Sequence, residues 1–258
     1  MLKGLYTAYT GMINEQHRMD TLTNNLANSA TVGYKKEGAT SQAFQDVLAY
    51  KIKDKSETPN LARRIGAMNM GVKVGENYTD YSEGPLKETE NTYDLALTGP
   101  GFFKIEFTNK AGATSTKYTR DGNFTMTEEG YLVTKDGDFV LDNRDRQIKL
   151  DPVKTSEIAT NGGIYQDGRL VATIGIADFE DYNYIEHYGE NLFQTVEGAE
   201  EKTATAQVLS GYLEHSNVQV VKEMVDMINV ARAYETNQKI IHTYDSSLEI
   251  AVNQLGKL

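Results

Sequence analysis

The side chains best suited to metal or acid chemistry in this sequence are its histidines and the aspartates of its turns. The sequence contains four histidines, at His17, His187, His215 and His242. Their spacings include no interval such as i, i+4 that would bring two imidazoles onto one zinc ion. Asp136, Asp138 and Asp142 stand in acidic turns, but a calcium loop starting at Asp142 would need glycine at its sixth position, where Gln147 stands. The sequence therefore predicts no metal site.

Other catalytic patterns are equally weak. Gly99-Pro100-Gly101 lacks the third glycine of a dinucleotide-binding loop, and no strand–loop–helix pattern surrounds it. Glu128 and Glu129 could flank a glycosidic bond, but neighbouring residues on a strand or turn point apart. The chain has no cysteine, which excludes disulfides and thiol chemistry. We expect no enzyme and no cofactor, although a hydrolase using turn carboxylates remains an alternative for which the sequence selects no residue.

An apolar heptad pattern near the N-terminus predicts a long helix. The apolar positions of this stripe are Leu5, Met12, Met19, Leu22 and Leu26. Leu5, Met12, Met19 and Leu26 recur every seven residues and Leu22 lies on the intervening line, which places all five on one narrow face of a helix. The asparagines and serine after residue 23 compete with helical hydrogen bonds, and Gly33 permits a left-handed turn, so the helix should end near Asn28.

A second, longer heptad pattern lies near the C-terminus. Its apolar positions are Val220, Met224, Met227, Ala231, Tyr234, Ile241, Leu248, Val252 and Leu255. No glycine or proline interrupts residues 218–255, so the pattern predicts a single helix of nearly 40 residues. Ser216 followed by Gln219 has capping-box spacing and should start it.

Between these ends, residues 71–200 have the pattern of a compact all-β domain. Apolar runs alternate with turn dipeptides at Asp121-Gly122, Glu129-Gly130, Asp136-Gly137 and Asp167-Gly168, each of which predicts a hairpin turn. The predicted fold is α+β, with long terminal helices that pair in a coiled-coil-like bundle and a central domain of short strands. We expect three regions: residues 1–70 as N-terminal helix and extended linker, 71–200 as β-domain, and 201–258 as C-terminal helix.

The two apolar stripes need partners that one small β-domain does not offer. A bare helix of this length spans about 55 Å at 1.5 Å per residue, and the longer helix overhangs the shorter one. Leaving about ten large apolar side chains in water would sacrifice on the order of 15 kcal/mol. We therefore expect neighbouring subunits to cover the remaining apolar surface, so that the two stripes form a self-assembly seam.

The charge distribution argues against nucleic-acid binding. The formal net charge is −11, and residues 71–200 carry 12 basic against 24 acidic side chains. No basic stripe stands out, and no apolar run reaches the roughly 18 residues of a membrane span. The N-terminus lacks the apolar run of a secretory signal peptide. We expect neither nucleic-acid partners nor membrane insertion.

Three motifs resemble the bacterial flagellar rod and hook protein family. Residues 22–28 read Leu-Thr-Asn-Asn-Leu-Ala-Asn, residues 118–124 read Tyr-Thr-Arg-Asp-Gly-Asn-Phe, and residues 211–218 read Gly-Tyr-Leu-Glu-His-Ser-Asn-Val. The motif residues are Asn24, Asn25, Ala27, Asn28, Gly33, Tyr34, Gly101, Phe102, Phe103, Tyr118, Arg120, Asp121, Gly122, Ser216, Asn217 and Val218. Residues 141–200 match no motif. Three motifs in the same order make the resemblance specific.

The resemblance implies a structural subunit of the flagellar basal-body rod that polymerises through its terminal helices and transmits torque from motor to hook. It implies export by the flagellar type III apparatus, axial proteins of the rod and hook as partners, and a place in the basal body within the cell envelope. The short β-region argues against a hook protein. The 211–214 and 232–235 motifs favour the distal rod over a proximal-rod paralogue, which stays an alternative. A further alternative is a glycan-binding β-module using Tyr182, Tyr184 and Tyr188.

Overall fold

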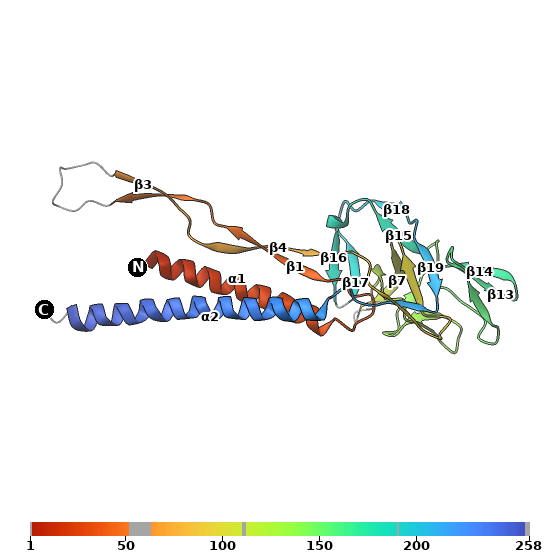
Figure 1. The fold of residues 1–258 in the computed structure, drawn as a ribbon. Coiled ribbons are helices and arrows are strands. Elements are labelled where there is room, and N and C mark those ends of the chain that lie inside the picture. Colours follow the sequence, from red (N-terminus) through yellow and green to blue (C-terminus); the bar gives the residue numbers. More distant parts are fainter. Residues whose placement is uncertain (1, 52–62, 110–111, 190, 256–258) are drawn as a thin grey trace. The chain divides into compact units, whose positions relative to one another are not determined.

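The computed structural model describes residues 2–51, 63–109, 112–189 and 191–255. Its elements confirm the coarse prediction of an α+β fold with an N-terminal helix, a central β-strand region and a C-terminal helix (Figure 1). Two compact units share the chain. The helix–ribbon unit comprises Met1–Leu26, Glu37–Asp80 and Val220–Leu258, and the β-unit comprises Ala27–Lys36 and Tyr81–Gln219. The boundaries of these units differ from those of the predicted regions. Residues 27–36 and 201–219 belong to the β-unit, and residues 71–80 belong to the helix–ribbon unit because the strand at Val72–Thr79 pairs with the strand at Glu37–Ala43.

The helix–ribbon unit contains both long helices. Helix α1 spans Leu2–Ala27 and helix α2 spans Val220–Ile250, which continues as a π-helical turn over Ala251–Leu255. The two helices run antiparallel, because Gly4 lies against Tyr244 while Gly11 lies against Asn237. In the described part of the chain, no helix is long and apolar enough to cross a membrane. The predicted helices are therefore present.

The start of α2 differs from the prediction. The helix begins at Val220, so Ser216 is not its N-cap. Instead, the hydroxyl of Ser216 accepts a hydrogen bond from the backbone N–H of Val218 at 3.3 Å. This short local bond belongs to the turn that precedes the helix.

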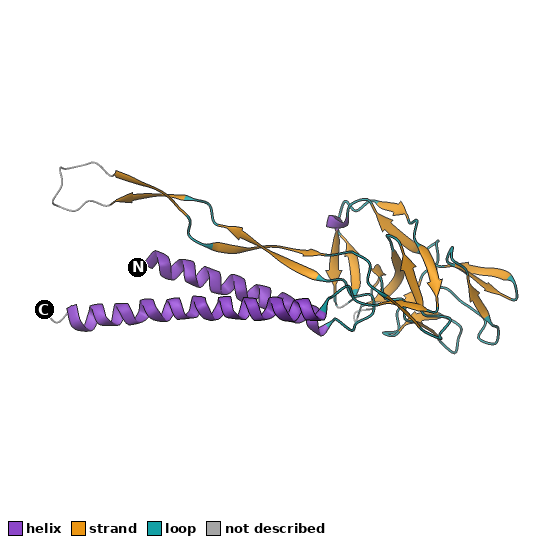
Figure 2. Ribbon diagram, in the orientation of Figure 1, coloured by secondary structure: helices purple, strands orange, loops and turns teal. Residues whose placement is uncertain are grey.

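The segment predicted as an extended linker is a two-stranded antiparallel ribbon (Figure 2). Strand β1 (Glu37–Ala43) pairs with β4 (Val72–Thr79), and β2 (Val47–Lys51) pairs with β3 (Arg63–Met68). The register of β1 against β4 shifts between Ala39 and Ser41, which marks a bulge. Within the unit, the ring of Phe44 lies 6.4 Å from that of Tyr6 on α1. The ribbon thus packs on the N-terminal helix.

The β-unit consists of short strands, as predicted. Their bounds are β5 (Leu86–Glu88), β6 (Leu95–Thr98), β7 (Phe102–Thr108), β8 (Thr114–Thr119), β9 (Phe124–Met126), β10 (Leu132–Thr134), β11 (Phe139–Val140), β12 (Ser156–Ile158), β13 (Gly163–Gln166), β14 (Arg169–Thr173), β15 (Ile176–Phe179), β16 (Ile185–Tyr188), β17 (Leu192–Thr195), β18 (Glu201–Thr203), β19 (Gln207–Ser210) and β20 (Tyr212–Glu214), with a 3₁₀ turn at Tyr182–Tyr184. All pairings between these strands are antiparallel.

A nine-stranded sheet dominates this unit. Its main path runs β16-β17-β8-β7-β11-β10-β9, and β15 pairs with both β7 and β18. Strands β12, β13 and β14 form a separate three-stranded sheet. The strands nearest the C-terminal helix return to the start of the unit, since β19 pairs with β6 and β20 pairs with β5. This return brings residues 207–214 beside residues 86–98.

Three of the four predicted hairpin turns are confirmed. Gly130 and Gly137 close the β9–β10 and β10–β11 hairpins with positive φ, and Asp167-Gly168 joins β13 to β14 with φ of 52° and 73°. Two consecutive positive φ values are typical of a type I′ turn, which matches the twist of a hairpin. The fourth prediction is wrong: β8 and β9 are not neighbours in the sheet, and the carbonyl oxygen of Gly122 instead accepts a hydrogen bond from the N–H of Leu95 at 2.9 Å.

Two apolar clusters form the core of the β-unit. The larger one packs Phe103 and Phe124 edge to face, with ring centroids 5.2 Å apart, among aliphatic residues of both sheets. The smaller one is aromatic and centres on Phe102, whose ring lies 5.2 Å from that of Phe193. These clusters hold in place the strands that carry the site described next.

Candidate functional site

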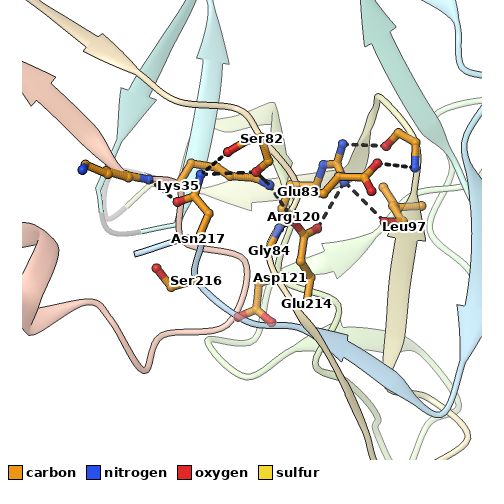
Figure 3. A network of polar contacts seen from close by, with 12 residues as sticks. Lys35, Ser82, Glu83, Gly84, Leu97, Arg120, Asp121, Glu214, Ser216 and Asn217 are labelled. Atoms are coloured by element: carbon orange, nitrogen blue, oxygen red, sulfur yellow. Dashed lines mark hydrogen bonds and ion pairs between the residues drawn. The ribbon is translucent and has the colours of Figure 1, made fainter. Parts of the chain in front are cut away.

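Lys35, Arg120 and Glu214 form a buried charge cluster in the β-unit (Figure 3). The Nζ of Lys35 lies 2.6 Å from Oε1 of Glu214, and Nη1 of Arg120 lies 3.1 Å from Oε2 of the same carboxylate. Lys35 and Glu214 are each 1% exposed, and Arg120 is 3% exposed. Charged side chains are almost never buried this deeply unless they are paired. One carboxylate therefore joins two cations from distant parts of the sequence.

Arg120 reaches beyond the carboxylate to the backbone of a neighbouring segment. Its Nη2 donates to the carbonyl oxygen of Gly99 at 2.8 Å, and its Nη1 lies 3.4 Å from that of Leu97. The guanidinium also lies 5.5 Å from the ring centroid of Phe102, within cation–π range. The planar, multiply donating guanidinium thus fixes the chain around β6 in a way that lysine could not.

Further hydrogen bonds saturate Glu214 and Lys35. The backbone N–H of Gly84 donates to Oε1 of Glu214 at 2.9 Å, and the N–H of Gly33 donates to its carbonyl oxygen at 2.8 Å. The ammonium of Lys35 donates to the carbonyl oxygen of Ser82 at 2.8 Å. A buried ion pair is tolerated only when such additional bonds satisfy its remaining atoms.

Burial dominates the electrostatics of the cluster. Removal from water lowers the pKa of Lys35, and the positive charge of Arg120 acts in the same direction. Glu214 and the more distant Glu83 oppose this shift by stabilising the ammonium form. Glu83 is exposed and its Oε1 accepts from the N–H of Gly99 at 2.6 Å. The electrostatic environment of the cluster therefore consists of two cations, Lys35 and Arg120, and two carboxylates, Glu214 and Glu83.

A second set of bonds lies beside this cluster. Oδ1 of Asn217 accepts from the N–H of Lys36 at 2.8 Å, and its Nδ2 donates to the carbonyl and hydroxyl oxygens of Ser82 at 3.2 and 3.1 Å. Asn217 thus bonds both the segment that follows α1 and the segment that precedes β5. Together with Glu214, it ties the chain leading into α2 to the chain leaving α1.

Two motif glycines are required by close backbone approaches. Gly33 has φ of 70°, and a Cβ placed there would overlap the backbone nitrogen of Asp121 and lie 2.5 Å from the carbonyl carbon of Arg120. A Cβ on Gly122 would overlap the carbonyl oxygen of Leu95. Any side chain at either position would push the strands of the cluster apart.

Asp121 anchors the turn that follows Arg120. Its Oδ1 accepts from the N–H of Asn123 and its Oδ2 from Nδ2 of Asn191, both at 2.9 Å. Burial raises the pKa of the Asp121 carboxyl, while these hydrogen bonds and Lys135 oppose the shift. The role of this motif aspartate is to organise a turn, not to titrate in a reaction.

Asn25 performs a similar task in the helix–ribbon unit. It is fully buried and pairs with Glu37 as one peptide group pairs with another: Nδ2 donates to the carbonyl oxygen at 2.7 Å, and Oδ1 accepts from the N–H at 2.9 Å. Its Nδ2 also lies 3.4 Å from Oε2 of Glu223, which is likewise fully buried. One side chain thus joins α1, the start of β1 and the first turn of α2.

The other motif residues have structural places. Phe102, Phe103 and Tyr118 are core residues, with the ring of Tyr118 5.0 Å from that of Phe179. Tyr34 is buried beside His187, at a ring distance of 5.9 Å. The remaining motif residues are buried at Gly101, Ser216 and Val218, half-buried at Asn28, and exposed at Asn24 and Ala27.

The sequence reasoning missed three central side chains. Glu214 stands within the quoted 211–218 motif and Lys35 directly follows the motif residue Tyr34, but neither was predicted as a site residue, and neither was Glu223. Their signal was a charged residue beside an apolar or aromatic neighbour, as in Tyr34-Lys35 and Leu213-Glu214. Such a pattern also occurs on ordinary half-exposed strands, so only their burial distinguishes them.

The predicted assembly residues occupy two environments on the helices. The half-buried ones are Leu5, Met12, Met19, Leu22, Leu26, Met227, Ala231, Tyr234 and Ile241. The exposed ones are Val220, Met224, Leu248 and Val252. The side chain of Leu255 lies outside the described residues.

The residues weighed for chemistry or sugar binding do not converge. Among the residues that the structure describes, no group of three or more His, Asp or Glu side chains could hold a metal ion. Tyr182 is half-buried, packs 5.0 Å from Tyr81 and donates its hydroxyl to Asp178 at 2.7 Å. Tyr184 and Tyr188 are exposed. The charge cluster is buried, and both carboxylate oxygens of Glu214 accept hydrogen bonds from other segments, while the Nε of Arg120 has no hydrogen-bond partner among the described residues. This arrangement holds chain segments together rather than presenting groups to a substrate.

Comparison with known proteins agrees with this structural role. Residues 5–35 match the family model described as "Flagella basal body rod protein", residues 96–172 match "Flagellar hook protein FlgE/F/G D1 domain", and residues 209–255 match "Flagellar basal body rod FlgEFG protein C-terminal". Each matched range contains one residue of the charge cluster: Lys35, Arg120 and Glu214 respectively. The cluster therefore joins the three segments on which the family is defined.

Full-length relatives match over nearly the whole chain. The flagellar basal-body rod protein FlgF of Caulobacter vibrioides is 34% identical, with all of both chains covered. The rod protein FlgG of Bacillus subtilis is 34% identical over 98% of this chain and 99% of its own, and the hook-basal body complex protein FlhO of the same organism is 31% identical over all of both chains. The chain therefore belongs to the flagellar basal-body rod protein family, as a structural and non-enzymatic subunit that assembles with other axial proteins in the basal body of the cell envelope.

Proposed function

We propose that this rod subunit polymerises through its terminal helices into a helical tube that transmits torque from motor to hook. The observation that carries the proposal is the exposed apolar surface near the start of α2. Its members are Val220, Val221, Met224, Val225 and Ile228. Val221 is 77% exposed. A soluble monomer would gain nothing from such a surface.

The energetics favour association through this surface. Burying each large apolar side chain contributes roughly 1.5 to 3 kcal/mol, so five of them amount to a large share of a stable interface. Helix α1 offers its own exposed residues Tyr6, Tyr9 and Ile13 on the same unit. Two different apolar patches on one molecule suit head-to-tail contacts, which build open filaments when the rotation does not close.

The charge cluster supports the mechanical part of the proposal. A subunit that bears load needs its terminal segments fixed to the folded domain. Lys35 lies just after the segment leaving α1, and Glu214 lies just before the segment entering α2. A closely packed, hydrogen-bonded cluster deforms little under stress. The cluster thus stabilises, within the β-unit, the segment that follows α1 and the segment that precedes α2.

The test is to place a charge in the exposed surface. We expect Val225→Asp to abolish polymerisation, because desolvating an unpaired carboxylate costs several kcal/mol. Thr155→Asp adds the same charge at an exposed polar position of the β-unit and should polymerise normally. Electron microscopy and sedimentation of the purified proteins measure both. Normal filaments from Val225→Asp would exclude this surface as the seam.

We further propose a distal-rod position for the subunit, with a proximal-rod position as the alternative. The support is the resemblance of residues 211–214 and 232–235 to the distal-rod form of the motif. Electron microscopy of purified basal bodies with this subunit labelled decides between the two positions. A label confined to the membrane-proximal part of the rod would overturn the distal assignment.

Export by the flagellar type III apparatus is part of the same proposal. The chain has no cysteine, so no disulfide would hinder its passage as an unfolded chain. Secretion of the tagged full-length protein should stop when the export apparatus is inactivated. Continued secretion under that condition would show another route.

A further inference from the structure

The two glycines of α1 face α2 in the helix–ribbon unit. Gly4 and Gly11 are the glycines of α1, and the sequence of α2 contains none. Glycine destabilises a helix interior relative to alanine. The presence of two glycines one heptad apart in a long helix therefore needs a physical explanation. Ala8, which lies between them on the same face, is 6% exposed.

Each glycine accommodates a larger side chain of α2. A Cβ on Gly4 would overlap the hydroxyl of Tyr244 and lie 2.8 Å from its Cζ. A Cβ on Gly11 would lie 3.1 Å from Nδ2 and 3.5 Å from Cγ of Asn237. The step of seven residues from Gly4 to Gly11 is matched by the reverse step from Tyr244 to Asn237. The two helices therefore interlock at equal spacing.

A polar contact at the other end of α1 keeps the same alignment. Asn25 and Glu223 lie 3.4 Å apart between Nδ2 and Oε2, and both side chains are fully buried. The step from Gly11 to Asn25 again equals the reverse step from Asn237 to Glu223. A buried polar residue in a helix pair is an effective means of selecting one register.

We propose that these three pairs act as a register lock, defined as Gly4 with Tyr244, Gly11 with Asn237, and Asn25 with Glu223. The lock holds α1 and α2 of one subunit in a single antiparallel alignment. Slipping by one heptad would separate Asn25 from Glu223 and place Gly11 opposite Val230 or Tyr244 instead of Asn237. The lock rests on the proposed function in one respect: it decides which apolar side chains remain outside for assembly.

In this lock, small and polar residues set the register between α1 and α2, and exposed apolar residues remain available for assembly. Each of the three lock pairs includes a glycine or a polar side chain, whereas Val221, Val225 and Ile228 are exposed on α2. A helix interface that is apolar throughout tolerates a shift by one heptad, because the apolar residue of one heptad resembles the equivalent residue of the next. The small and polar pairs remove that degeneracy.

Cysteine cross-linking in the full-length monomer tests the register. The chain has no native cysteine, so each engineered pair reports one contact. We expect Gly11→Cys with Asn237→Cys to form an intramolecular disulfide under mild oxidation. The matched control, Gly11→Cys with Tyr244→Cys, tests the alignment displaced by one heptad and should not form one.

Every outcome of that comparison is informative. Selective cross-linking of the first pair supports the lock. Equal cross-linking of both pairs, preference for the second pair or no cross-link in either overturns it. Because the readout uses monomers, it is independent of whether the protein polymerises through these helices, and a failure of the proposed function would leave the result unchanged.

A substitution that reverses the usual effect of helix propensity provides a second test. Gly4→Ala would stabilise α1 as an isolated helix. In the subunit, however, the added methyl group overpacks the contact with Tyr244. Disulfide formation between the cysteines at 11 and 237 should therefore slow by about tenfold or more. Adding Tyr244→Ala should restore the rate. Gln16→Ala, at an exposed position of α1, should leave it unchanged. A Gly4→Ala rate equal to that of Gln16→Ala would overturn the lock.

Discussion

Lys35 and Glu214 stand 179 positions apart in the sequence, and their side chains meet at 2.6 Å in the interior of the β-unit. The contact joins the segment that follows the N-terminal helix, where Lys35 lies, to the segment that precedes the C-terminal helix, where Glu214 lies. Arg120 joins from the middle of the sequence through the second oxygen of the carboxylate. One buried carboxylate thus joins three segments of the β-unit. Removal of the Glu214 carboxylate should therefore destabilise the whole unit.

Glu214→Gln should destabilise the β-unit by about 3 to 5 kcal/mol, because it leaves Lys35 and Arg120 buried without a compensating carboxylate. Urea denaturation followed by tyrosine fluorescence measures the loss. Glu129→Gln removes an exposed carboxylate and should change stability by less than about 0.5 kcal/mol. Adding Lys35→Met to Glu214→Gln should recover part of the loss, since it removes one unpaired charge. Equal stability of the two single variants would show that the cluster contributes little.

Gly33→Ala should be far more harmful than an alanine at another left-handed glycine. Both Gly33 and Gly137 have positive φ, but a Cβ on Gly33 would overlap the backbone of Asp121, whereas one on Gly137 would meet nothing within 4 Å. Gly137→Ala should therefore cost only the left-handed backbone penalty of about 1 to 2 kcal/mol. Thermal unfolding of the two variants isolates the steric part. Similar melting temperatures would contradict the close approach of the two segments.

Asp121→Asn should change how stability depends on acidity. Burial raises the pKa of Asp121 above 3.8 in the folded protein, so between 3.8 and the folded value the native state binds more protons than the unfolded state. By linkage, the contribution of Asp121 to the free energy of unfolding decreases as pH rises through that window. The asparagine variant lacks this term. Its stability relative to the parent protein should rise with pH from about 3.8 and then level off, as measured by urea unfolding at a series of pH values.

A relative stability of Asp121→Asn that stayed constant, or fell, across that window would contradict the raised pKa. Glu129→Asn serves as the control, because Glu129 is exposed in a turn. The comparison separates the buried carboxyl from the general titration of the acidic β-unit.

Leu248→Asp should prevent polymerisation and leave the β-unit folded. Leu248 is 36% exposed on α2, outside the β-unit, so a charge there acts on contacts of the helix and not on the sheet core. Burying that carboxylate in a seam would cost several kcal/mol. Sedimentation reports polymerisation, and the melting transition of the β-unit reports folding. Ser247→Asp, one exposed position earlier, is the matched control. Filaments formed by Leu248→Asp would remove this residue from the seam.

The sequence by itself determined the elements and the family. Heptad spacing predicted both long helices, and the absence of glycine and proline supported the C-terminal one, because helix formation depends on local periodicity and propensity. Glycine-containing dipeptides located three hairpin turns for the same local reason. The order of three motifs pointed to flagellar rod proteins, and the comparisons confirmed it.

Only the tertiary structure decided what the charged and small motif residues do. Sequence spacing carries no information on which of two acidic residues will be buried, so Glu214 and Glu223 looked like any surface glutamate. The turn at Asp121-Gly122 resembled a hairpin, yet its carbonyl bonds Leu95 from a different strand. Burial, charge pairing and the register between α1 and α2 depend on contacts between segments that are distant in the sequence, with 94 positions between Arg120 and Glu214 and 179 between Lys35 and Glu214. Such contacts cannot be read from local sequence patterns.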